Sequence, residues 1–345
     1  MIFEHIIGRG RRDPVASCAK RMTSQRGVAL IIALILVALA TILASKLTFQ
    51  GFLERRRTTG VLAAEQALHF GMGAEALAAD VLAQDAPNGQ TVLSAPWAQP
   101  TQPLPITPQD DPEGEPIGTL QGELEDMQGR FNLNNLGHWT FDQTTKKPEQ
   151  DQQPLEQFRR LLQSVGLETK WAGMARDWID ADDLPGSPDG AEDQIYTSQT
   201  PPYHTGNYPM MSPSELMNLP GFGADRYRKI APYVTALPSA TVKINICTAS
   251  APVLESLAPN LGEYNNPELL TNYRKTGCFP DYIALGNILK SKGPGAATAE
   301  YYGTKSDYFR LTTRITLGTT EFTLYSLLKR DGSKTTPLLR SFGTP

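Results

Sequence analysis

The hydrophobic residues of the chain form one uninterrupted run near its N-terminus. Seventeen residues follow Gly27 without a charge, and Thr41 is the only polar side chain among them. A helix of that length covers about 26 Å, close to the ~30 Å hydrocarbon core of a bilayer. Arg21 and Arg26 precede the run, so the positive-inside rule places the N-terminus in the cytoplasm. The run therefore predicts a single-pass membrane anchor over residues 28–48 that carries a large exported body.

A cleaved secretory signal peptide is the alternative explanation of this run. Such a peptide has an apolar region of about 7–15 residues that ends at a small-residue cleavage site. Here the apolar run is longer, and the helical pattern continues beyond it. Apolar or small residues recur at a helical period as far as Val81, and Pro87 ends the pattern. We therefore expect a retained anchor and one helix from Gly27 to about Gln84, in which residues 49–85 pack one face on a globular domain.

Beyond the long helix, strand patterns appear near the beginning and near the end of the rest of the chain. Residues 86–116 hold eight prolines, which predicts a surface connection rather than a core element. Residues 117–127 then alternate apolar and polar side chains, as a strand does. Near the C-terminus, residues 308–331 alternate in the same way around a turn at Leu317–Thr320. This second pattern predicts a β-hairpin.

The block between these strands, residues 154–300, has the pattern of helices and loops. Residues 155–167 and 171–183 each place apolar side chains on one face of a helix. Ser212, followed by Glu215 three residues later, predicts the capping box of a third helix. Strands on both sides of a helical block indicate an α+β fold with a large inserted α-helical domain. We expect residues 86–135 and 300–345 to form a pilin-like β domain together, and residues 136–299 to form the inserted helical domain.

Charge and composition restrict the partners of the exported part. The chain has 345 residues, with 32 basic and 36 acidic side chains and a net charge of −4. Six basic and two acidic residues lie before Val28. A cut there leaves 26 basic and 34 acidic side chains, a net charge of −8. An acidic body argues against nucleic acid or an anionic membrane surface as the main partner. The four histidines are too scattered along the sequence for a zinc site.

Cysteine usage leaves two outcomes open. Cys18 lies in the segment before the anchor, so Cys247 and Cys278 are the two that remain in the exported part. An even number of cysteines in an exported domain is compatible with a disulfide. Two separate buried thiols are the alternative.

The densest group of carboxylates lies in residues 177–196. Like charges at this density repel unless a cation or several donors compensate. A hard cation with roughly six to eight oxygen ligands suits such a loop, although the sixth residue from Asp180 is Pro185 rather than the glycine of an EF-hand. A solvated acidic loop is the alternative. Six acids fall within 14 positions: Asp180, Asp182, Asp183, Asp189, Glu192 and Asp193.

The sequence offers no catalytic motif. It contains no G-x-S-x-G, no Walker glycine loop and no H-E-x-x-H, so we do not expect an enzyme. Residues 219–230 resemble a helix-hairpin-helix element, in which a glycine turn can bind a phosphate beside basic residues such as Arg226, Arg228 and Lys229. The acidic net charge and the extracytoplasmic location favour a compact helical packing unit instead.

The N-terminal run resembles the type IV prepilin class. In that class a basic leader ends in a glycine, a membrane prepilin peptidase cuts after the glycine, and an apolar helix follows. On this resemblance the cut separates Gly27 from Val28, which becomes a methylated N-terminus. The leader of residues 1–27 is long for the class, so Met22 is the expected true start. Pilins usually carry glutamate as the fifth mature residue, whereas this chain has Ile32.

Motifs along the mature chain resemble the K-type minor pseudopilins of type II secretion. Besides the non-acidic Ile32, they are GRFNLNNL at 129–136, GAED at 190–193, Tyr196, Pro201–Tyr203, Asn207, the S-x-x-E-L element, the I-N-x-x-T-A-S element and the C-terminal hairpin. The resemblance implies a pilin-like fold, with a long N-terminal helix packed on an antiparallel sheet, and a calcium ion in the acidic loop. The ligands that it implies are Asp182, Asp183, Asp189, Glu192, Asp193 and Asn207.

The same resemblance implies a position at the tip of a short periplasmic fibre anchored in the bacterial inner membrane. Its partners would be the I-type and J-type minor pseudopilins and the major pseudopilin, and the fibre would export folded proteins. Ile32 agrees with a tip position, because it offers no carboxylate to the terminal amine of a subunit above it in lipid. A large inserted head would also clash if it repeated along a fibre. The anchor is expected to pack through apolar side chains: Leu30, Ile31, Ile32, Leu34 and Ile35.

Two other functions are compatible with these residues. One is a DNA-uptake or competence pseudopilin that uses the hairpin-like elements as DNA contacts. The other is a membrane-anchored periplasmic calcium-binding module that belongs to no fibre.

Overall fold

The computed structural model of the chain describes most of its residues: 26–108, 111, 113–141, 146 and 148–344. The expected start at Met22 lies outside the described residues. The chain divides into two compact units, residues 1–62 and residues 63–345. Helix α1, Arg26–Asp85, belongs to both units and confirms the helix predicted from the hydrophobic pattern.

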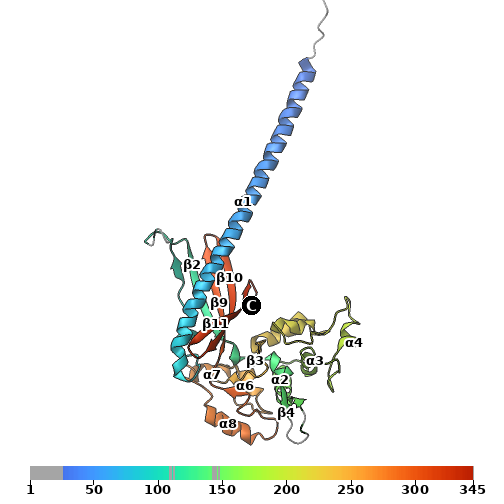
Figure 1. Cartoon of the computed structure of the whole chain (residues 1–345), viewed down its shortest axis with the longest axis vertical. Helices are drawn as coiled ribbons and strands as arrows, with labels where there is room; N and C mark the ends of the chain where they lie inside the picture. Colours follow the sequence, from blue (N-terminus) through green and yellow to red (C-terminus); the bar gives the residue numbers. More distant parts are fainter. Residues whose placement is uncertain (1–25, 109–110, 112, 142–145, 147, 345) are drawn as a thin grey trace, which may run out of the picture. The chain divides into compact units, whose positions relative to one another are not determined.

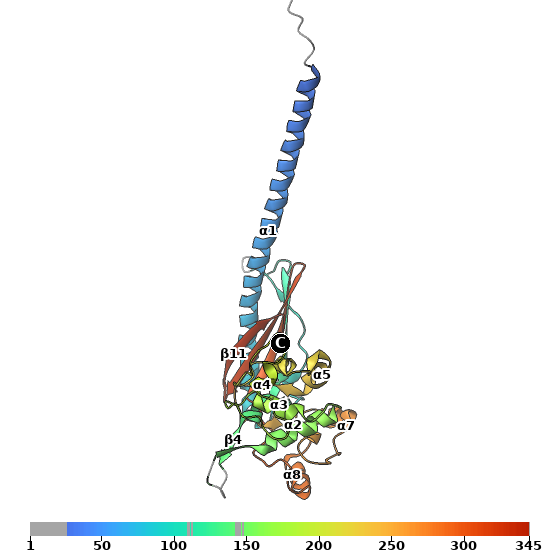
Figure 2. The ribbon, with the colours of Figure 1, turned by 90° about the vertical axis from the view of Figure 1, so that its right-hand side faces the viewer.

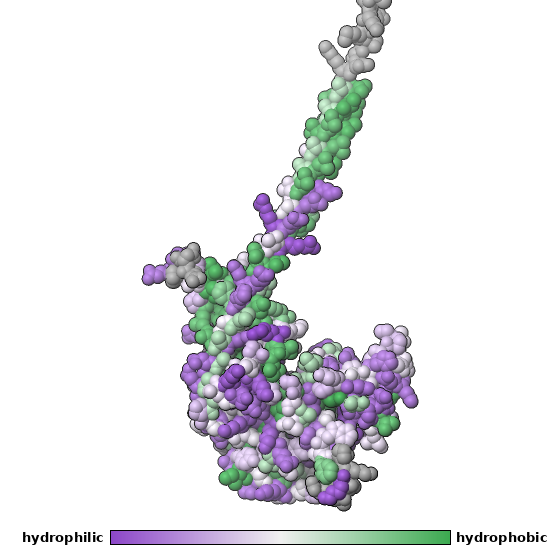
Figure 3. Space-filling model, in the orientation of Figure 1, coloured by the Kyte–Doolittle hydropathy of each residue, from purple (hydrophilic) through white to green (hydrophobic). Residues whose placement is uncertain are grey.

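The first unit contains the apolar part of α1. An 18-residue window of this part has a mean hydropathy of 2.9, and none of the window is buried. Figure 3 shows hydrophobic side chains over this stretch and hydrophilic ones further along the helix. The Thr41 hydroxyl lies 3.0 and 2.8 Å from the carbonyl oxygens of Val37 and Ala38, so it is satisfied without water. The helix therefore has the length and composition of a single-pass membrane anchor.

An antiparallel sheet of five strands lies in the second unit (Figure 1). In the order β1-β2-β9-β10-β11 the strands are Leu104–Ile106, Gly118–Asp126, Tyr308–Leu317, Thr320–Asp331 and Lys334–Phe342. β2 confirms the strand predicted before the helical block, and β9 with β10 confirms the predicted hairpin. Leu317 pairs with Thr320, and Gly318 between them has a φ of 57°, a left-handed conformation that glycine adopts without strain.

Residues 63–85 of α1 lie along one face of this sheet, as both ribbon views show (Figures 1 and 2). The hydrophobic side chains buried on this part of the helix are mostly small: Ala67, Ala74, Ala78 and Leu82. A Cβ on Gly71 would lie only 2.4 Å from Cδ2 of Leu324 on β10. Glycine at this position therefore permits the close approach of helix and sheet.

Two ion pairs with buried carboxylates join α1 to the sheet. Glu75, which is 5% exposed, binds Nε and Nη2 of Arg340 at 2.7 Å each and accepts from Ser326 Oγ at 2.6 Å. Nη1 of Arg330 lies 3.1 Å from the carboxylate of Asp85. Because each buried charge has an opposite charge and further hydrogen bonds, the cost of removing it from water is offset.

The chain leaves the sheet to form the helical block and returns to the sheet next to the place where it left. β2 ends at Asp126, β9 begins at Tyr308, and Asp126 pairs with Phe309 in the ladder. The two ends of the block therefore lie on neighbouring strands at the same level. An insertion at this place leaves the pairing of the sheet intact.

Asp126 is the centre of a buried hydrogen-bond network at this junction. It is 6% exposed, and it accepts from Thr248 Oγ1 at 2.6 Å, Ser306 Oγ at 2.7 Å and Asn245 Nδ2 at 2.8 Å. Asn245 also donates to the main-chain oxygen of Thr91 at 2.9 Å. Burial raises the pKa of Asp126, and its hydrogen bonds oppose that rise. The network connects the sheet with both ends of the helical block.

The helical block is built from short elements around one apolar core. Its α-helices are α2 Gln152–Ser164, α3 Trp171–Asp177, α4 Asp193–Tyr196, α5 Gly223–Ile230, α6 Ala251–Glu255, α7 Pro267–Tyr273 and α8 Tyr282–Ser291. Its strand pairs are β3 Phe131–Asn132 with β6 Val234–Thr235, β4 Trp139–Phe141 with β5 Pro148–Gln150, and β7 Ile244–Asn245 with β8 Tyr302–Gly303. Within the core Phe131 stacks on Phe158, with ring centroids 5.2 Å apart.

Two predicted helices differ from the structure in length or type. The helix expected over residues 171–183 is α3, which ends at Asp177 because that side chain turns back to bind backbone N–H groups of the following loop. The capping box of Ser212 is confirmed, but it begins a 3₁₀-helix, η5 Pro213–Asn218, instead of an α-helix. Leu219 follows in an extended conformation and ends this short element.

The asparagines of residues 129–136 bind distant parts of the chain. Asn134 Nδ2 donates to the carbonyl oxygens of Met210 and Leu237, both at 2.9 Å, and Asn135 exchanges hydrogen bonds with the backbone of Val242. The expected corner is present as β3 and the 3₁₀-helix η4, Leu133–Gly137. Its asparagines act as tertiary connectors and not only as local turn residues.

We predict that Asp126→Ala lowers the free energy of unfolding of the full chain by roughly 3–5 kcal/mol, because several buried donors lose their acceptor. Chemical unfolding of the protein in detergent measures this change. Asp225→Ala is the matched control, since that side chain is 89% exposed and its removal should change stability by less than about 0.5 kcal/mol. Equal effects of the two variants would contradict the role given to the junction.

Candidate metal centre

The acidic loop follows α3 and is shaped by the carboxylate at the end of that helix. Oδ2 of Asp177 accepts hydrogen bonds from the backbone N–H groups of Gly186 and Ala191, both at 2.9 Å. A Cβ on Gly190 would lie 2.3 Å from the same oxygen. The chain can therefore close around Asp177 only because residue 190 has no side chain.

Three carboxylates converge inside this loop. Asp180, Asp182 and Glu192 each place one oxygen so that the three atoms lie within 4.8 Å of one another. Asp180 and Glu192 are 6% and 5% exposed, whereas Asp182 is exposed. Negative charges at this separation repel strongly when they are shielded from water. The arrangement therefore requires a compensating charge or protonation.

Several oxygen atoms of the loop are buried without a hydrogen-bond partner among the described residues. Asp180 Oδ2 accepts from Gln150 Nε2 at 2.6 Å, but Asp180 Oδ1 is unpaired. Both carboxylate oxygens of Glu192 and Oδ1 of Asn207 are unpaired as well. Buried polar atoms in folded proteins nearly always have a partner, so this concentration of unpaired acceptors is suited to binding a donor or a cation.

The electrostatics of the loop agree with that interpretation. Burial raises the pKa of Glu192 to about 7, and the nearby charges of Asp177 and Asp180 raise it too. Burial also raises the pKa of Asp180 to about 6, with a hydrogen bond from Gln150 acting in the opposite direction. A bound cation would reverse these shifts, because it stabilises the ionised form of each carboxylate.

An aromatic cluster of Trp178, Tyr196 and Tyr203 packs beside the acidic loop. Tyr196 is fully buried, and its ring centroid lies 5.4 Å from those of both Trp178 and Tyr203. Trp178 Nε1 donates to Glu215 Oε2 at 3.2 Å, which connects the loop to the capping box of η5. These contacts hold the carboxylates on a rigid base rather than on a free surface loop.

The other predicted ligands have protein partners. Asp183 Oδ1 lies 3.3 Å from Asn207 Nδ2, and Asp189 lies 3.8 Å from Arg159. The remaining acid, Asp193, binds His204 at 2.6 Å and the backbone and hydroxyl of Thr205 at 2.9 and 3.0 Å. The structure thus brings Asp182 and Glu192 together with Asp180, which was not in the predicted ligand set.

The donor set suits a hard cation. Its free atoms are carboxylate and amide oxygens, the ligands that Ca²⁺ and Mg²⁺ prefer, whereas zinc and copper sites use His or Cys. Glu192 has both oxygens free, as bidentate coordination requires. Asp177, whose second oxygen is also unpaired, shapes the loop around this set. Asp180 lies three residues after Asp177, in the turn that follows α3, where its N–H donates to the carbonyl oxygen of Arg176 at 3.0 Å.

The chain is similar to components of one secretion machinery. Residues 129–239 match a family model described as Type II secretion system (T2SS), protein K. The type II secretion system protein K of Pectobacterium carotovorum subsp. carotovorum is 32% identical over 331 residues, covering 92% of this chain and 97% of that protein. The protein of the same name from Klebsiella pneumoniae is 33% identical over 330 residues, with the same coverage. The chain belongs to the type II secretion system protein K family.

A solved structure shows the same fold. One chain in the crystal structure of the GspK-GspI-GspJ complex from enterotoxigenic Escherichia coli matches this chain with a TM-score of 0.63 and 24% identity. The match covers 84% of this chain and all of that one. The predicted pilin-like α+β fold is therefore confirmed, and as a member of this family the protein is a minor pseudopilin of type II secretion.

Other predicted residues are placed as follows. Cys247 and Cys278 are joined by a disulfide in the structure. Two of the three basic residues of the helix-hairpin-helix-like element form ion pairs within the protein, since Arg226 binds Glu168 at 3.2 Å and Arg228 binds Asp225 at 3.1 Å. The apolar side chains expected to pack in the membrane are all more than half exposed: Leu30, Ile31, Ile32, Leu34 and Ile35.

We predict that a Cys247→Ala/Cys278→Ala double variant loses roughly 2–4 kcal/mol of stability, because the cross-link restricts the unfolded chain. Chemical unfolding of the full chain measures the loss. Alkylation of the mature protein under denaturing, non-reducing conditions should label neither cysteine. Labelling of both would show two free thiols and contradict the pairing.

Proposed function

We propose that this protein caps the periplasmic pseudopilus and initiates its assembly with the I-type and J-type pseudopilins, above the major pseudopilin. The fibre then exports folded proteins across the outer membrane, and this subunit has no catalytic task. On this proposal prepilin peptidase cuts between Gly27 and Val28, and α1 holds the protein in the inner membrane with its N-terminus initially cytoplasmic. The new N-terminus is then methylated.

The observation that carries this proposal is the side chain of Ile32. It is the fifth residue after the expected cut, and it is apolar and 53% exposed on α1. A charged amine in hydrocarbon is costly unless a carboxylate pairs with it. A subunit without that carboxylate cannot neutralise the amine of a subunit stacked above it, so it is tolerated best where no subunit lies above.

The helical block supports the same position. It extends from the end of β2 to the start of β9 and adds a separate apolar core to the pilin-like sheet. A subunit repeated along a fibre has neighbours on several sides, and a head of this size would collide with them. At the tip of the fibre no subunit lies above the head, so a large head has room there.

We also propose that the acidic loop binds calcium through Asp180, Asp182 and Glu192, with Asn207 as a further oxygen donor. The ion would neutralise the converging carboxylates and join α3 to α4 across the loop. The unpaired oxygens of Asp180 and Glu192 support this proposal. Asp189 and Asp193 have partners in Arg159 and His204, so their contribution would be to hold the loop.

We predict that calcium raises the melting temperature of the purified full-length protein in detergent and that a chelator lowers it. A ligand that binds only the folded state stabilises it by about 2.7 kcal/mol at a hundredfold excess over Kd. Asp180→Asn and Glu192→Gln should each remove most of the calcium response. Asp225→Asn is the control and should retain it, because that side chain is exposed on α5. A wild-type melting curve that ignores both calcium and chelator would contradict the site.

We predict that Ile32→Glu does not lengthen the fibres and reduces secretion mildly or not at all, because its carboxylate would have no amine above it to neutralise. Ile35→Glu, at a neighbouring and equally exposed position, is the matched control for placing a carboxylic acid in lipid. Fibre length under overexpression and secretion of a native substrate measure both variants. Longer fibres or improved secretion with Ile32→Glu alone would show that the protein is an ordinary stacked subunit.

A further inference from the structure

Helix α1 carries three consecutive arginines shortly after its apolar part. The charged residues of segment 46–57 are Lys46, Glu54, Arg55, Arg56 and Arg57, a net charge of +3 in a chain whose net charge is −4. All five side chains are exposed. Figure 3 shows hydrophilic side chains that project on both sides of the helix just beyond its hydrophobic stretch. The span does not need these charges, because its length and apolar composition suffice to anchor it.

The arginine triplet, Arg55 to Arg57, has no anionic partner among the residues that the structure describes. None of its guanidinium groups forms an ion pair there, although Glu54 is adjacent in sequence. Arg56 instead lies over the ring of Phe52, with its Cζ 4.8 Å from the ring centroid. The guanidinium donors are therefore available to an anion from outside the chain.

The distance from the apolar run places the triplet at a membrane surface. Arg55 follows Val28 by 27 residues, which is about 40 Å along a helix. A tilt of about 20° reduces this rise to about 38 Å. The hydrocarbon core is ~30 Å thick, and each headgroup layer adds roughly 6 Å. With Val28 at one edge of the core, the Cα atoms of the triplet thus lie just outside the headgroup layer of the other edge.

The side chains of the triplet extend back toward that layer. The Cα–Cβ bonds of a helix are tilted toward its N-terminus, which here is the direction of the membrane span. The contact of Arg56 with Phe52, one turn nearer the N-terminus, follows this direction. Phe49 and Phe52, which are 62% and 51% exposed, continue the apolar surface toward the same level. An arginine can cover such a surface with its stem and keep its charge among the headgroups.

The spread of the triplet around the helix favours lipid over a second protein helix as its partner. Successive residues of an α-helix are about 100° apart, so three arginines cover about 200° of the circumference. A neighbouring helix contacts one side of α1 and reaches only part of this arc. Headgroups surround a spanning helix, so they can bind all three guanidinium groups.

A solvated charge run is the ordinary explanation of such residues. It does not account for their position, because basic residues are disfavoured beside the exported end of a membrane span. Arginines at this place oppose the expected orientation of the anchor unless an interaction at that surface compensates.

We propose that Arg55, Arg56 and Arg57 bind the phosphate groups of anionic phospholipids at the surface where α1 leaves the bilayer. A guanidinium group suits this ligand, because it can donate two parallel hydrogen bonds to phosphate oxygens. On the orientation given in the proposed function, the lipids are those of the periplasmic leaflet. That choice of leaflet rests on the proposed function, whereas the lipid contact requires only that α1 spans the bilayer.

Lipid retention by the purified full-length protein tests the inference. The protein is loaded in detergent micelles with equal amounts of phosphatidylglycerol and phosphatidylcholine, and native mass spectrometry counts the lipids that stay bound. The wild type should retain at least about five times more phosphatidylglycerol, since each basic residue near a membrane surface strengthens the attraction to anionic lipid. The triple variant Arg55→Gln/Arg56→Gln/Arg57→Gln should lower this ratio to below about two, without changing the melting temperature.

Two further variants separate the charge from its position. Replacement of all three arginines by lysine keeps the charge and should keep the ratio within about threefold of the wild type. Lys229→Gln/Lys275→Gln/Lys290→Gln is the matched control, because it removes the same charge from exposed positions of the second unit. It should retain phosphatidylglycerol as the wild type does.

The other outcomes overturn the inference in distinguishable ways. Equal retention of both lipids by the wild type, or an unchanged ratio in the glutamine variant, would mean that the triplet is only solvated, and the proposed function would stand. Loss of the preference in a large excess of inorganic phosphate would show a site for free anions. A glutamine variant that keeps its lipids but loses another pseudopilin would assign the triplet to a protein contact. If alkali extracts the wild type from membranes, α1 is no anchor, and the proposed function fails with the inference.

Discussion

The fold depends on the buried carboxylate of Asp126, where the sheet, the returning chain and the helical block meet. Its partners Asn245 and Thr248 lie in one segment and Ser306 in another, at 119, 122 and 180 residues from Asp126 in sequence. Since β2 and β9 are adjacent, the chain can leave one strand and return on the next without disturbing the ladder. A polar junction of this kind orients the block specifically, because its hydrogen bonds are satisfied in one arrangement only.

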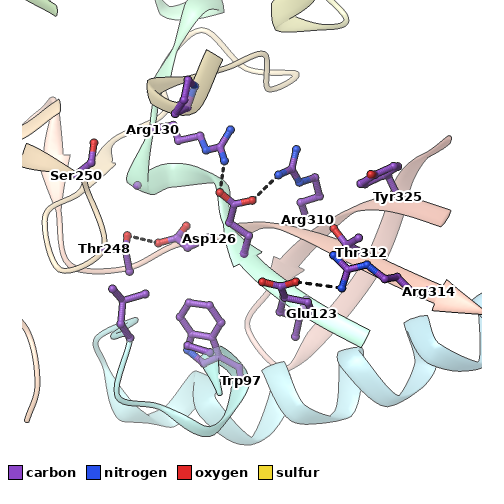
Figure 4. A pocket seen from close by; sticks show the side chains of 16 residues that line it. Trp97, Glu123, Asp126, Arg130, Thr248, Ser250, Arg310, Thr312, Arg314 and Tyr325 are labelled. Carbon is purple, nitrogen blue, oxygen red and sulfur yellow. Dashed lines mark hydrogen bonds and ion pairs between the residues drawn. The ribbon is translucent and has the colours of Figure 1, made fainter. Parts of the chain in front are cut away.

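The functional features follow from that arrangement. One face of the sheet is covered by residues 63–85 of α1, whereas Arg310, Thr312 and Arg314 of β9 line a cavity on the other face (Figure 4). Within the block, the apolar core leaves the acidic loop to be organised by Asp177 and the aromatic cluster around Tyr196. The anchor, by contrast, has no buried side chain in its most apolar window, as expected for a helix whose partners are lipid and other helices.

Local sequence patterns predicted most helices and strands, but they could not predict contacts between residues far apart in sequence. The apolar run, the alternation in β9 and β10 and the Ser212 capping box each depend on neighbours in sequence, so they could be recognised from the chain alone. Asp180 was counted among the acids of the loop but not among the expected ligands, because its convergence with Glu192 depends on how the loop closes around Asp177. The asparagines of residues 129–136 predicted a corner, but their partners near Met210 and Val242 follow only from tertiary packing.

The position and copy number of the protein in assembled fibres test the account most directly. Electron cryomicroscopy of isolated pseudopili can locate the subunit, because the helical block makes its head larger than a pilin-like domain alone. The account predicts one copy at one end of each fibre, in contact with I-type and J-type subunits. Copies distributed along the fibre would contradict it, since a subunit with Ile32 and this inserted head would then tolerate neighbours above it.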